Sequence, residues 1–323
     1  MHLVEPFVIP KARMLMKPSL AVACCVLLLA GSALAQTDPA QPARAVQVPT
    51  AGLSSSPEPL RAFVFIPAAT AATEHPAVVM VHGCGGAYDK DGKLNARHAM
   101  WGEYLAAQGY VALMLDSFSS RGLKEICTVK FSERTLKEAD RVGDAYAALA
   151  YLRQLPGVDP NRIAVLGWSH GAGVVLDTIT ARPPILPTPT GTTLASASAS
   201  SGRAGFSAAI AFYPGCTSRN KKSDRFHPYA PVLLIIGEAD DWTPAAPCKA
   251  LAAAVAARGE PMQIVTYPDT YHDFDSPALT AKRVRMDVPN GVNPGAGVTT
   301  APNREAREDA KQRVKAFLAD HLQ

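Results

Sequence analysis

The residues with the clearest chemical potential lie in the segment Gly167-Trp-Ser-His-Gly171, which places Ser169 between two glycines. This segment follows the apolar run Arg162-Ile-Ala-Val-Leu166 and opens a stretch of helical character over residues 170–181. A sharp turn from strand to helix strains the serine backbone, so glycines two residues away on each side prevent clashes. The hydroxyl then lies at a helix amino-terminus, which favours developing negative charge. The pattern predicts a nucleophilic Ser169; the alternative is a glycine-rich turn with a surface serine.

A serine nucleophile needs a base, and the base needs a carboxylate that orients it. For a nucleophile on this kind of strand–turn–helix, the chain order is serine, acid and histidine. His272 follows both the serine and an acidic loop, whereas His227 precedes that loop and His321 lies in a terminal helical stretch. His82 precedes the serine itself. We therefore expect His272 to be the general base.

The acidic loop follows the apolar run Val232-Leu-Leu-Ile-Ile236 and has the sequence Gly-Glu-Ala-Asp-Asp-Trp-Thr-Pro. The acid must project toward the carboxyl edge of the sheet after Gly237 has turned the chain, and Asp240 suits this requirement best. Asp241 is the alternative acid; its other role would be to cap the helix that begins at Pro244.

The oxyanion that forms when a serine attacks a carbonyl group needs two preorganised N–H donors. We expect one donor to be the backbone of His170, directly after the nucleophile. The second should come from Val81-His-Gly-Cys-Gly-Gly86, because its glycines allow the backbone to approach a substrate closely. Cys84 is the first choice for this donor and Gly85 the second.

Three further side chains are candidates for substrate binding. Arg121 lies on a loop at the expected catalytic edge, where its guanidinium could bind a substrate carboxylate through two parallel hydrogen bonds. An ordinary structural ion pair is the alternative for Arg121. Trp168 and Trp242 lie next to the candidate serine and acid and could line the acyl pocket, with core packing as the alternative.

The elements that must position these residues alternate along the chain between apolar runs and helical stretches. The runs cover residues 62–66, 77–81, 110–115, 162–166, 208–212, 232–236 and 263–267. The helical stretches lie near residues 98–108, 133–154, 170–181, 245–258 and 303–322. Continuous apolar runs indicate strands buried on both faces, as in a mainly parallel sheet. The sequence therefore predicts a doubly wound α/β domain, flanked by helices on both sides.

The first residues have the layout of a secretory signal peptide. Basic residues precede the apolar run Leu20–Ala30, and Ala33-Leu-Ala35 forms a small-residue cleavage site. The alternative, a membrane anchor, needs about 20 apolar residues, and this run is shorter. We therefore expect cleavage after Ala35 and a periplasmic or secreted protein without membrane attachment.

The rest of the chain divides by composition into three kinds of segment. Residues 36–58 are rich in Ala, Pro, Gln and Ser and are expected to form a flexible lead-in. Residues 59–323 are expected to form a single domain. Within it, residues 183–204 are a low-complexity insertion without a core face.

Charge and cysteine content exclude some functions. The 32 Lys and Arg residues against 28 Asp and Glu give a net charge of +4 without a basic stripe, which argues against nucleic-acid binding. Beyond residue 35, the cysteines Cys84, Cys127, Cys216 and Cys248 show no C-x-x-C spacing, so we expect no metal site. In an exported chain they predict two disulfides, and we favour Cys84–Cys127 and Cys216–Cys248 because each pair falls on loops at one end of the sheet. Buried free thiols are the alternative.

These segments together resemble the dienelactone hydrolase family of the α/β-hydrolase superfamily. The resemblance rests on five segments: Val81-His-Gly-Cys-Gly-Gly, Gly109-Tyr-Val-Ala-Leu with the following Asp-Ser-Phe, Gly167-Trp-Ser-His-Gly, Gly237-Glu-Ala-Asp-Asp-Trp-Thr-Pro and Tyr271-His-Asp-Phe. It implies the α/β-hydrolase fold and hydrolysis of an enol-lactone by a cysteine held by Asp and His. Here Ser169 stands at the cysteine position, and Gly83 stands where the founding enzymes have a glutamate.

We therefore expect a serine hydrolase that cleaves small carboxylic esters or lactones through an acyl-enzyme, without metal or cofactor. One alternative is a peptidase of the prolyl-oligopeptidase type, which uses the same triad but normally needs a gating domain. The other is a catalytically silent binding protein on a hydrolase fold.

Overall fold

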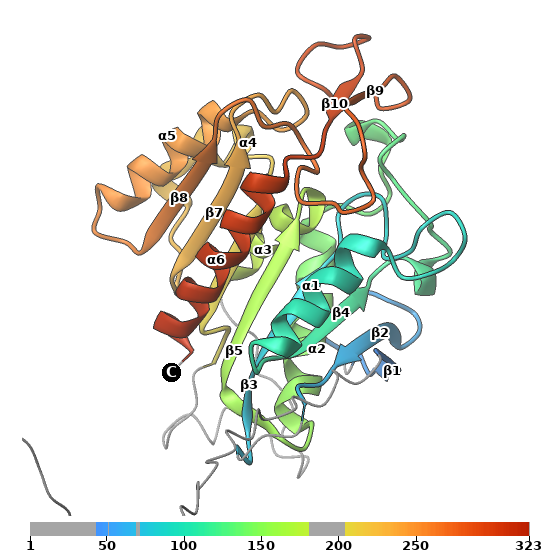
Figure 1. The fold of residues 1–323 in the computed structure, drawn as a ribbon, viewed down its shortest axis with the longest axis vertical. Helices are drawn as coiled ribbons and strands as arrows, with labels where there is room; N and C mark the ends of the chain where they lie inside the picture. Colours follow the sequence, from blue (N-terminus) through green and yellow to red (C-terminus); the bar gives the residue numbers. More distant parts are fainter. Residues whose placement is uncertain (1–42, 51, 69–71, 181–203, 323) are drawn as a thin grey trace, which may run out of the picture. The chain divides into compact units, whose positions relative to one another are not determined.

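The computed structural model describes residues 43–50, 52–68, 72–180 and 204–322. Within these ranges, one sheet has the strand order β1-β2-β4-β3-β5-β6-β7-β8 (Figure 1). Strands β3 to β8 pair in parallel, whereas β2 pairs antiparallel with both β1 and β4. The strand bounds are β1 Arg44–Val48, β2 Leu60–Phe65, β3 His75–Val81, β4 Val111–Asp116, β5 Val158–Trp168, β6 Ala208–Phe212, β7 Val232–Gly237 and β8 Met262–Tyr267.

The parallel part of the sheet forms because its strands are apolar along their whole length. All residues of β4, β6 and β7 are buried, as the continuous apolar runs predict. Helices cover both faces: α1 and α6 lie on the near face in Figure 1, and α2, α3 and α5 lie behind the sheet. The helix bounds are α1 Ala96–Ala107, α2 Val142–Gln154, α3 His170–Thr180, α4 Thr217–Asn220, α5 Ala245–Ala256 and α6 Arg304–His321. The predicted doubly wound α/β fold is confirmed.

Strand β1 lies inside the segment 36–58, for which the sequence predicts no regular structure, so that prediction is wrong for residues 44–48. The strand is at the edge of the sheet, and only Val48 of its five residues is fully buried. A short edge strand with one buried side chain leaves no apolar pattern to detect. The predicted signal peptide lies outside the described residues, and so does the insertion 183–204 except Ala204.

The predicted helical stretch 133–154 is shorter in the structure. Only residues of α2 are α-helical, and the chain before it forms two 3-10 turns, η2 (Phe131–Glu133) and η3 (Ala139–Arg141). These turns lie at the end of the sheet where the parallel strands terminate. Two further 3-10 turns, η1 (Ser119–Arg121) and η4 (Ser223–Arg225), and the short strands β9 (Arg283–Arg285) and β10 (Val298–Thr300) complete the elements.

Both predicted disulfides are present at the carboxyl ends of the strands. Cys84 after β3 is bonded to Cys127, and Cys216 after β6 is bonded to Cys248 in α5.

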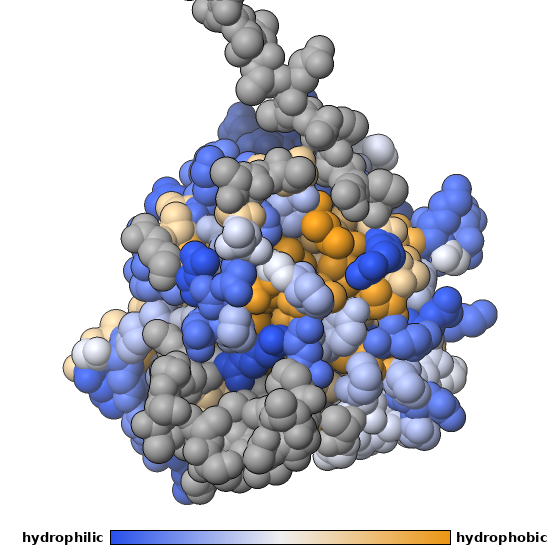
Figure 2. Space-filling model, turned by 90° about the horizontal axis from the view of Figure 1, so that it is seen from below, coloured by the Kyte–Doolittle hydropathy of each residue, from blue (hydrophilic) through white to orange (hydrophobic). Residues whose placement is uncertain are grey.

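Figure 2 shows the opposite end of the described unit, where the parallel strands begin and apolar residues lie among mostly polar ones. Among the helices of the described ranges, none has the length and apolar character needed to cross a membrane.

Candidate active site

Ser169 occupies a strained turn between β5 and α3. Its φ of 51° is in the left-handed region, which is rare for a residue with a side chain. The flanking glycines are required by space: a Cβ at Gly167 would lie 2.4 Å from the Gly171 carbonyl oxygen, and one at Gly171 would lie 2.2 Å from the Val81 oxygen. Hydrogen bonds from Ser169 N to Phe212 O and from Gly173 N to Ser169 O, both 2.9 Å, fix the turn from either side. The structure therefore places this serine as the sequence predicts, where β5 ends and α3 begins.

His272 and Asp240 form a buried pair. His272 Nδ1 lies 2.7 Å from Asp240 Oδ2, and the side chains are 1% and 0% exposed. The other carboxylate oxygen, Oδ1, accepts hydrogen bonds from the backbone N–H groups of Trp242 (2.9 Å) and Thr243 (2.8 Å). This carboxylate is thus oriented by its own loop, and its Oδ2, which also lies 3.0 Å from the Thr243 hydroxyl, accepts from the imidazole.

Asp241, the alternative acid, has a different partner. Its two carboxylate oxygens accept hydrogen bonds from the backbone N–H and the hydroxyl of Thr299, both at 2.7 Å. Successive residues in the loop after β7 point in different directions, so one carboxylate meets the histidine and the next holds β10. Between the two candidates, the geometry favours Asp240.

The two imidazole nitrogens of His272 differ in their surroundings. Nε2 is buried and has no hydrogen-bond partner among the described residues, Ser169 included. Burial acts to lower the pKa of His272, but the charge of Asp240 and its hydrogen bond outweigh burial and raise this pKa above its ordinary value of 6.5. Trp242 and Tyr213 pack against the ring at centroid distances of 4.6 and 4.5 Å and hold it in place.

A buried carboxylate that the sequence analysis missed supports the loop of His272. Asp275 Oδ2 accepts hydrogen bonds from the indole N–H groups of Trp101 (2.9 Å) and Trp168 (3.0 Å). Its Oδ1 accepts the Tyr213 hydroxyl at 2.6 Å. Three donors from separate elements converge on this carboxylate three residues after His272. No spacing in the sequence signals such a contact, because its partners are distant along the chain.

The expected oxyanion donors flank Ser169. A Cβ at Gly83 would lie 3.4 Å from the Ser169 Cβ, so the segment after β3 passes directly over the serine. A small inner pocket is lined by Ser169, His170 and Cys84 together. Neither the Cys84 nor the His170 backbone N–H donates to an acceptor in the described part of the chain. Both amides are therefore available for an oxygen bound above Ser169.

A larger cavity of about 660 Å³ adjoins the inner pocket. Both spaces share the lining residues Phe131, Arg134, Glu138, His170, Gly215, Trp242 and Thr243. Trp242 is therefore at the pocket, as the sequence predicts. Arg134 is buried, donates to the Val129 carbonyl oxygen at 3.1 Å and makes no ion pair within the described ranges. The sequence gives no signal for Arg134, because nothing in its spacing distinguishes it from a surface arginine.

Two of the predicted substrate contacts differ from the structure. Arg121 donates to both carboxylate oxygens of the buried Asp144, at 3.0 and 2.9 Å, so the structural ion pair is correct and the substrate contact is not. Trp168 is fully buried in the core, with its N–H on Asp275, and does not line either cavity. Trp168 is the last residue of β5, and the strand is buried from Ile163 to its end.

A mainly parallel eight-stranded sheet, with a strained serine after a central strand and an Asp–His pair after the following strands, defines an α/β-hydrolase. The sequence profile of the dienelactone hydrolase family matches residues 60–186 and 190–322. The chain belongs to the dienelactone hydrolase family.

Individual proteins are also similar to this chain. The chain is 31% identical over 121 residues to the quorum-quenching protein AidA of Acinetobacter baumannii (strain MDR-ZJ06). That match covers 36% of this chain and 34% of the relative, so the chain spans about a third of that protein's length. A proposed dienelactone hydrolase of Klebsiella pneumoniae subsp. pneumoniae MGH 78578 superposes with a TM-score of 0.60 at 18% identity, covering 86% of this chain and 99% of the other. Thermogutta terrifontis esterase 2, phosphoramylated by tabun, superposes with a TM-score of 0.56 at 20% identity, covering 86% of this chain and 94% of the other. The two structures show the shared fold.

Proposed function

We propose that this protein is a serine hydrolase that cleaves small carboxylic esters or lactones through an acyl-enzyme. The observation that carries the proposal is the buried His272–Asp240 pair, whose remaining imidazole nitrogen has no protein partner in the described ranges, on the sheet edge that also carries Ser169. Because Nδ1 is bonded to Asp240, Nε2 is the nitrogen that can accept a proton from Ser169.

The reaction proceeds in two balanced steps. His272 Nε2 removes the hydroxyl proton as Ser169 Oγ attacks the carbonyl carbon, and the carbonyl oxygen takes the negative charge. The N–H groups of Cys84 and His170 bind this oxyanion, and the imidazolium, stabilised by Asp240, returns the proton to the leaving alkoxide. Water then repeats the sequence on the acyl-enzyme and releases a carboxylic acid. In a lactone, the alcohol and the carboxylic acid are parts of one product.

The chemistry of the cavity favours an ester with an acidic group. Arg134 lines both the inner pocket and the larger cavity, and its guanidinium has no carboxylate partner among the described residues. A charge-assisted hydrogen bond to a desolvated guanidinium is stronger than one between neutral groups. Phe131 and Trp242 on the same walls supply apolar contact for the rest of the substrate.

We also propose that the protein is exported, with residues 1–35 as its signal peptide. The two disulfides agree with this, because such bonds form and persist in oxidising compartments. Mass spectrometry of the mature chain tests the prediction, which requires an amino-terminus at Gln36.

Covalent labelling tests the proposed nucleophile. A fluorophosphonate probe should modify Ser169 stoichiometrically and abolish hydrolysis of p-nitrophenyl esters, whereas aminoacyl anilides should be poor substrates. Ser169→Ala should remove labelling and turnover while the melting temperature changes little. Ser218→Ala is the matched control, because Ser218 lines the larger cavity yet has no assigned role in the reaction. A folded wild-type protein that is not labelled would refute the proposal.

A further inference from the structure

A buried arginine connects the two segments that carry the expected oxyanion donors. Arg141, the last residue of η3, is 0% exposed and forms no ion pair in the described part of the chain. Its Nη1 lies 2.9 Å from His170 Nδ1, and its Nη2 donates to the carbonyl oxygen of His82 at 3.0 Å. The guanidinium also packs over the Phe118 ring, 5.0 Å from its centroid.

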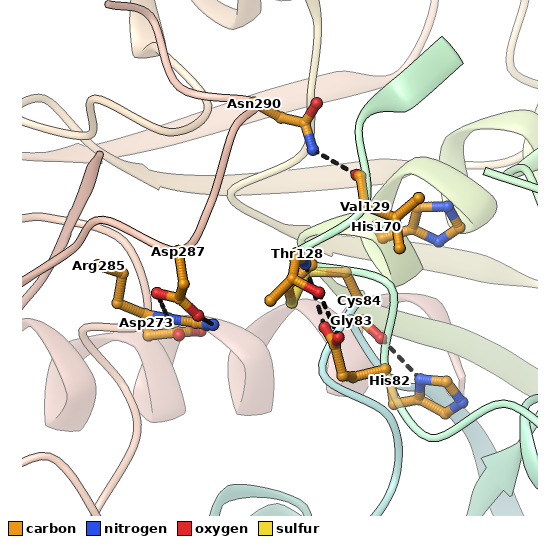
Figure 3. The surroundings of a disulfide bond; sticks show 12 residues. His82, Gly83, Cys84, Thr128, Val129, His170, Asp273, Arg285, Asp287 and Asn290 are labelled. Atoms are coloured by element: carbon orange, nitrogen blue, oxygen red, sulfur yellow. Dashed lines mark hydrogen bonds and ion pairs between the residues drawn. A yellow bond between two sulfur atoms is a disulfide. The ribbon is translucent and has the colours of Figure 1, made fainter. Parts of the chain in front are cut away.

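The protons in this cluster can be assigned. Ser117 N–H donates to His82 Nε2 at 3.2 Å, so the His82 proton is on Nδ1, which donates to the Gly83 carbonyl oxygen at 2.7 Å (Figure 3). The 3.4 Å separation between Arg141 Nη2 and His82 Nδ1 therefore joins two donors and is not a hydrogen bond. Burial and the charge of Arg141 hold the pKa of His82 well below its ordinary value, so the ring is neutral.

These contacts set two consecutive peptide planes. Arg141 fixes the carbonyl of His82, and the His82 ring fixes the carbonyl of Gly83. In a trans peptide the N–H points opposite to the C=O, so fixing the Gly83 carbonyl also fixes the direction of the Cys84 N–H. On its other side, Cys84 is held by the disulfide to Cys127 (Figure 3). A 2.8 Å hydrogen bond from Ile126 N to the Cys84 carbonyl oxygen holds it as well.

The second contact of Arg141 orders the start of α3. An arginine has no acceptor atom, so His170 Nδ1 must be unprotonated and its proton is on Nε2. Burial, reinforced by the charge of Arg141, places the pKa of His170 well below its ordinary value, and this ring is also neutral. One guanidinium thus holds a carbonyl on one donor segment and the side chain of the other.

The cost of this arrangement argues for a role beyond folding. A buried cation without a carboxylate partner loses solvation that no ion pair offsets, and an apolar residue of similar size would avoid that loss. Burial lowers the pKa of Arg141 to about 10, so the group is still charged at neutral pH. Arg141 Nε has no partner within the described ranges either.

We propose that Arg141 is a positioning residue for the oxyanion hole. It aligns the Cys84 and His170 amides by holding the segment after β3 and the start of α3 in fixed positions relative to each other. The inference rests on the proposed hydrolase function. It assigns Arg141 no contact with the substrate, because this side chain is 0% exposed and lines neither the inner pocket nor the larger cavity.

The test compares Arg141→Met and Arg141→Lys with Arg153→Met. Arg153, in the helix α2 that follows Arg141, is a matched control, since its guanidinium also links backbone carbonyls, those of Pro160 and Gly205, away from the cavity. Each variant is assayed with a p-nitrophenyl ester and the corresponding thionoester. A hole shaped for oxygen should make wild-type protein much faster on the ester, because sulfur is larger and a weaker acceptor.

We expect Arg141→Met to lower kcat on the ester about 10²–10³-fold with KM nearly unchanged, the size of effect seen when one oxyanion donor is lost. The ester-to-thionoester rate ratio should fall by at least about tenfold. Arg141→Lys should give intermediate values, because an ammonium group can reach one of the two acceptors. Arg153→Met should match wild type in both quantities.

The rate ratio separates positioning from a structural role. A loss of kcat with an unchanged ratio in Arg141→Met would overturn the inference, since a general loss of folded protein slows both substrates equally. If Arg141→Met does not fold, Arg141→Lys decides, and a wild-type ratio in that variant refutes the proposal. Failure of the proposed function is distinct: wild-type protein would then neither hydrolyse esters nor be labelled at Ser169, and the inference would fall with it.

Discussion

Substituting Asp240 by asparagine should separate its orienting role from its size. Oδ1 of Asp240 accepts two backbone N–H groups, from Trp242 and Thr243. An asparagine must keep its carbonyl oxygen at the Oδ1 position. The flipped amide would point its NH₂ group at both backbone N–H donors, and each unsatisfied donor would cost about 1–3 kcal/mol of stability. The side-chain NH₂ group then faces His272 Nδ1 and donates to it. The imidazole proton is driven to Nε2, the nitrogen that must accept the proton of Ser169.

The expected fall in kcat of Asp240→Asn has two causes. Restoring the productive tautomer places two donors together and costs about 1–3 kcal/mol. The imidazolium also loses its carboxylate, an effect worth about 1–3 pKa units, or about 1.4–4 kcal/mol. The sum is near 5 kcal/mol, which corresponds to a fall in kcat of about 10³–10⁴.

The assay measures kcat and KM for a p-nitrophenyl ester, together with the melting temperature of Asp240→Asn. Asp241→Asn is the control, because that adjacent carboxylate binds Thr299 and not the imidazole. It should leave kcat nearly unchanged. If Asp240→Asn retains kcat within about tenfold of wild type, or if Asp241→Asn loses as much, the assignment of the acid is wrong.

Three further predictions concern pH, specificity and stability. Because His272 must be neutral to accept a proton and Asp240 raises its pKa, activity should fall as the pH drops, with a midpoint above 6.5 that moves lower in Asp240→Asn; a kcat/KM–pH profile with the same midpoint in both proteins contradicts this. Arg134→Gln should raise KM for a dicarboxylic monoester about tenfold or more relative to a neutral ester of the same alcohol, and equal changes for the two esters would exclude a contact with the acid group. Asp275→Ala leaves three buried donors without an acceptor and should lower the free energy of unfolding in urea by about 3–5 kcal/mol; a loss below about 1 kcal/mol would show that the core relaxes around the gap.

The fold and the order of the site residues are predictable because they depend on local patterns. The long apolar runs determine which strands are buried. The glycines of the Gly167–Gly171 motif permit the tight turn that follows β5. Strand β1 is not predictable in this way, since its stability comes from pairing with β2 and not from its own side chains. The pairing of cysteines is predictable because both bonds join segments at one end of the sheet.

The partners of individual side chains were harder to predict than their positions. Arg121 and Arg134 both follow the strands at the cavity end. Only the structure shows that Arg121 is paired with Asp144, whereas Arg134 has no carboxylate partner in the described part of the chain. Asp240 and Asp241 are adjacent and chemically identical, and only the direction of the backbone distinguishes them. Partners contributed by distant elements, such as the three donors on Asp275, leave no local signal.

Because of the bond between Cys84 and Cys127, the specific activity of a preparation should depend on whether the protein was produced in an oxidising or a reducing compartment. Material produced in a reducing host compartment would contain the same sheet and helices, yet the loop beside Ser169 would lack its covalent anchor. Circular dichroism would not distinguish such molecules from oxidised ones, whereas active-site titration would count them as a slower fraction. Batches with equal purity and different thiol content should therefore differ in specific activity, and mild oxidation should bring them to a common value.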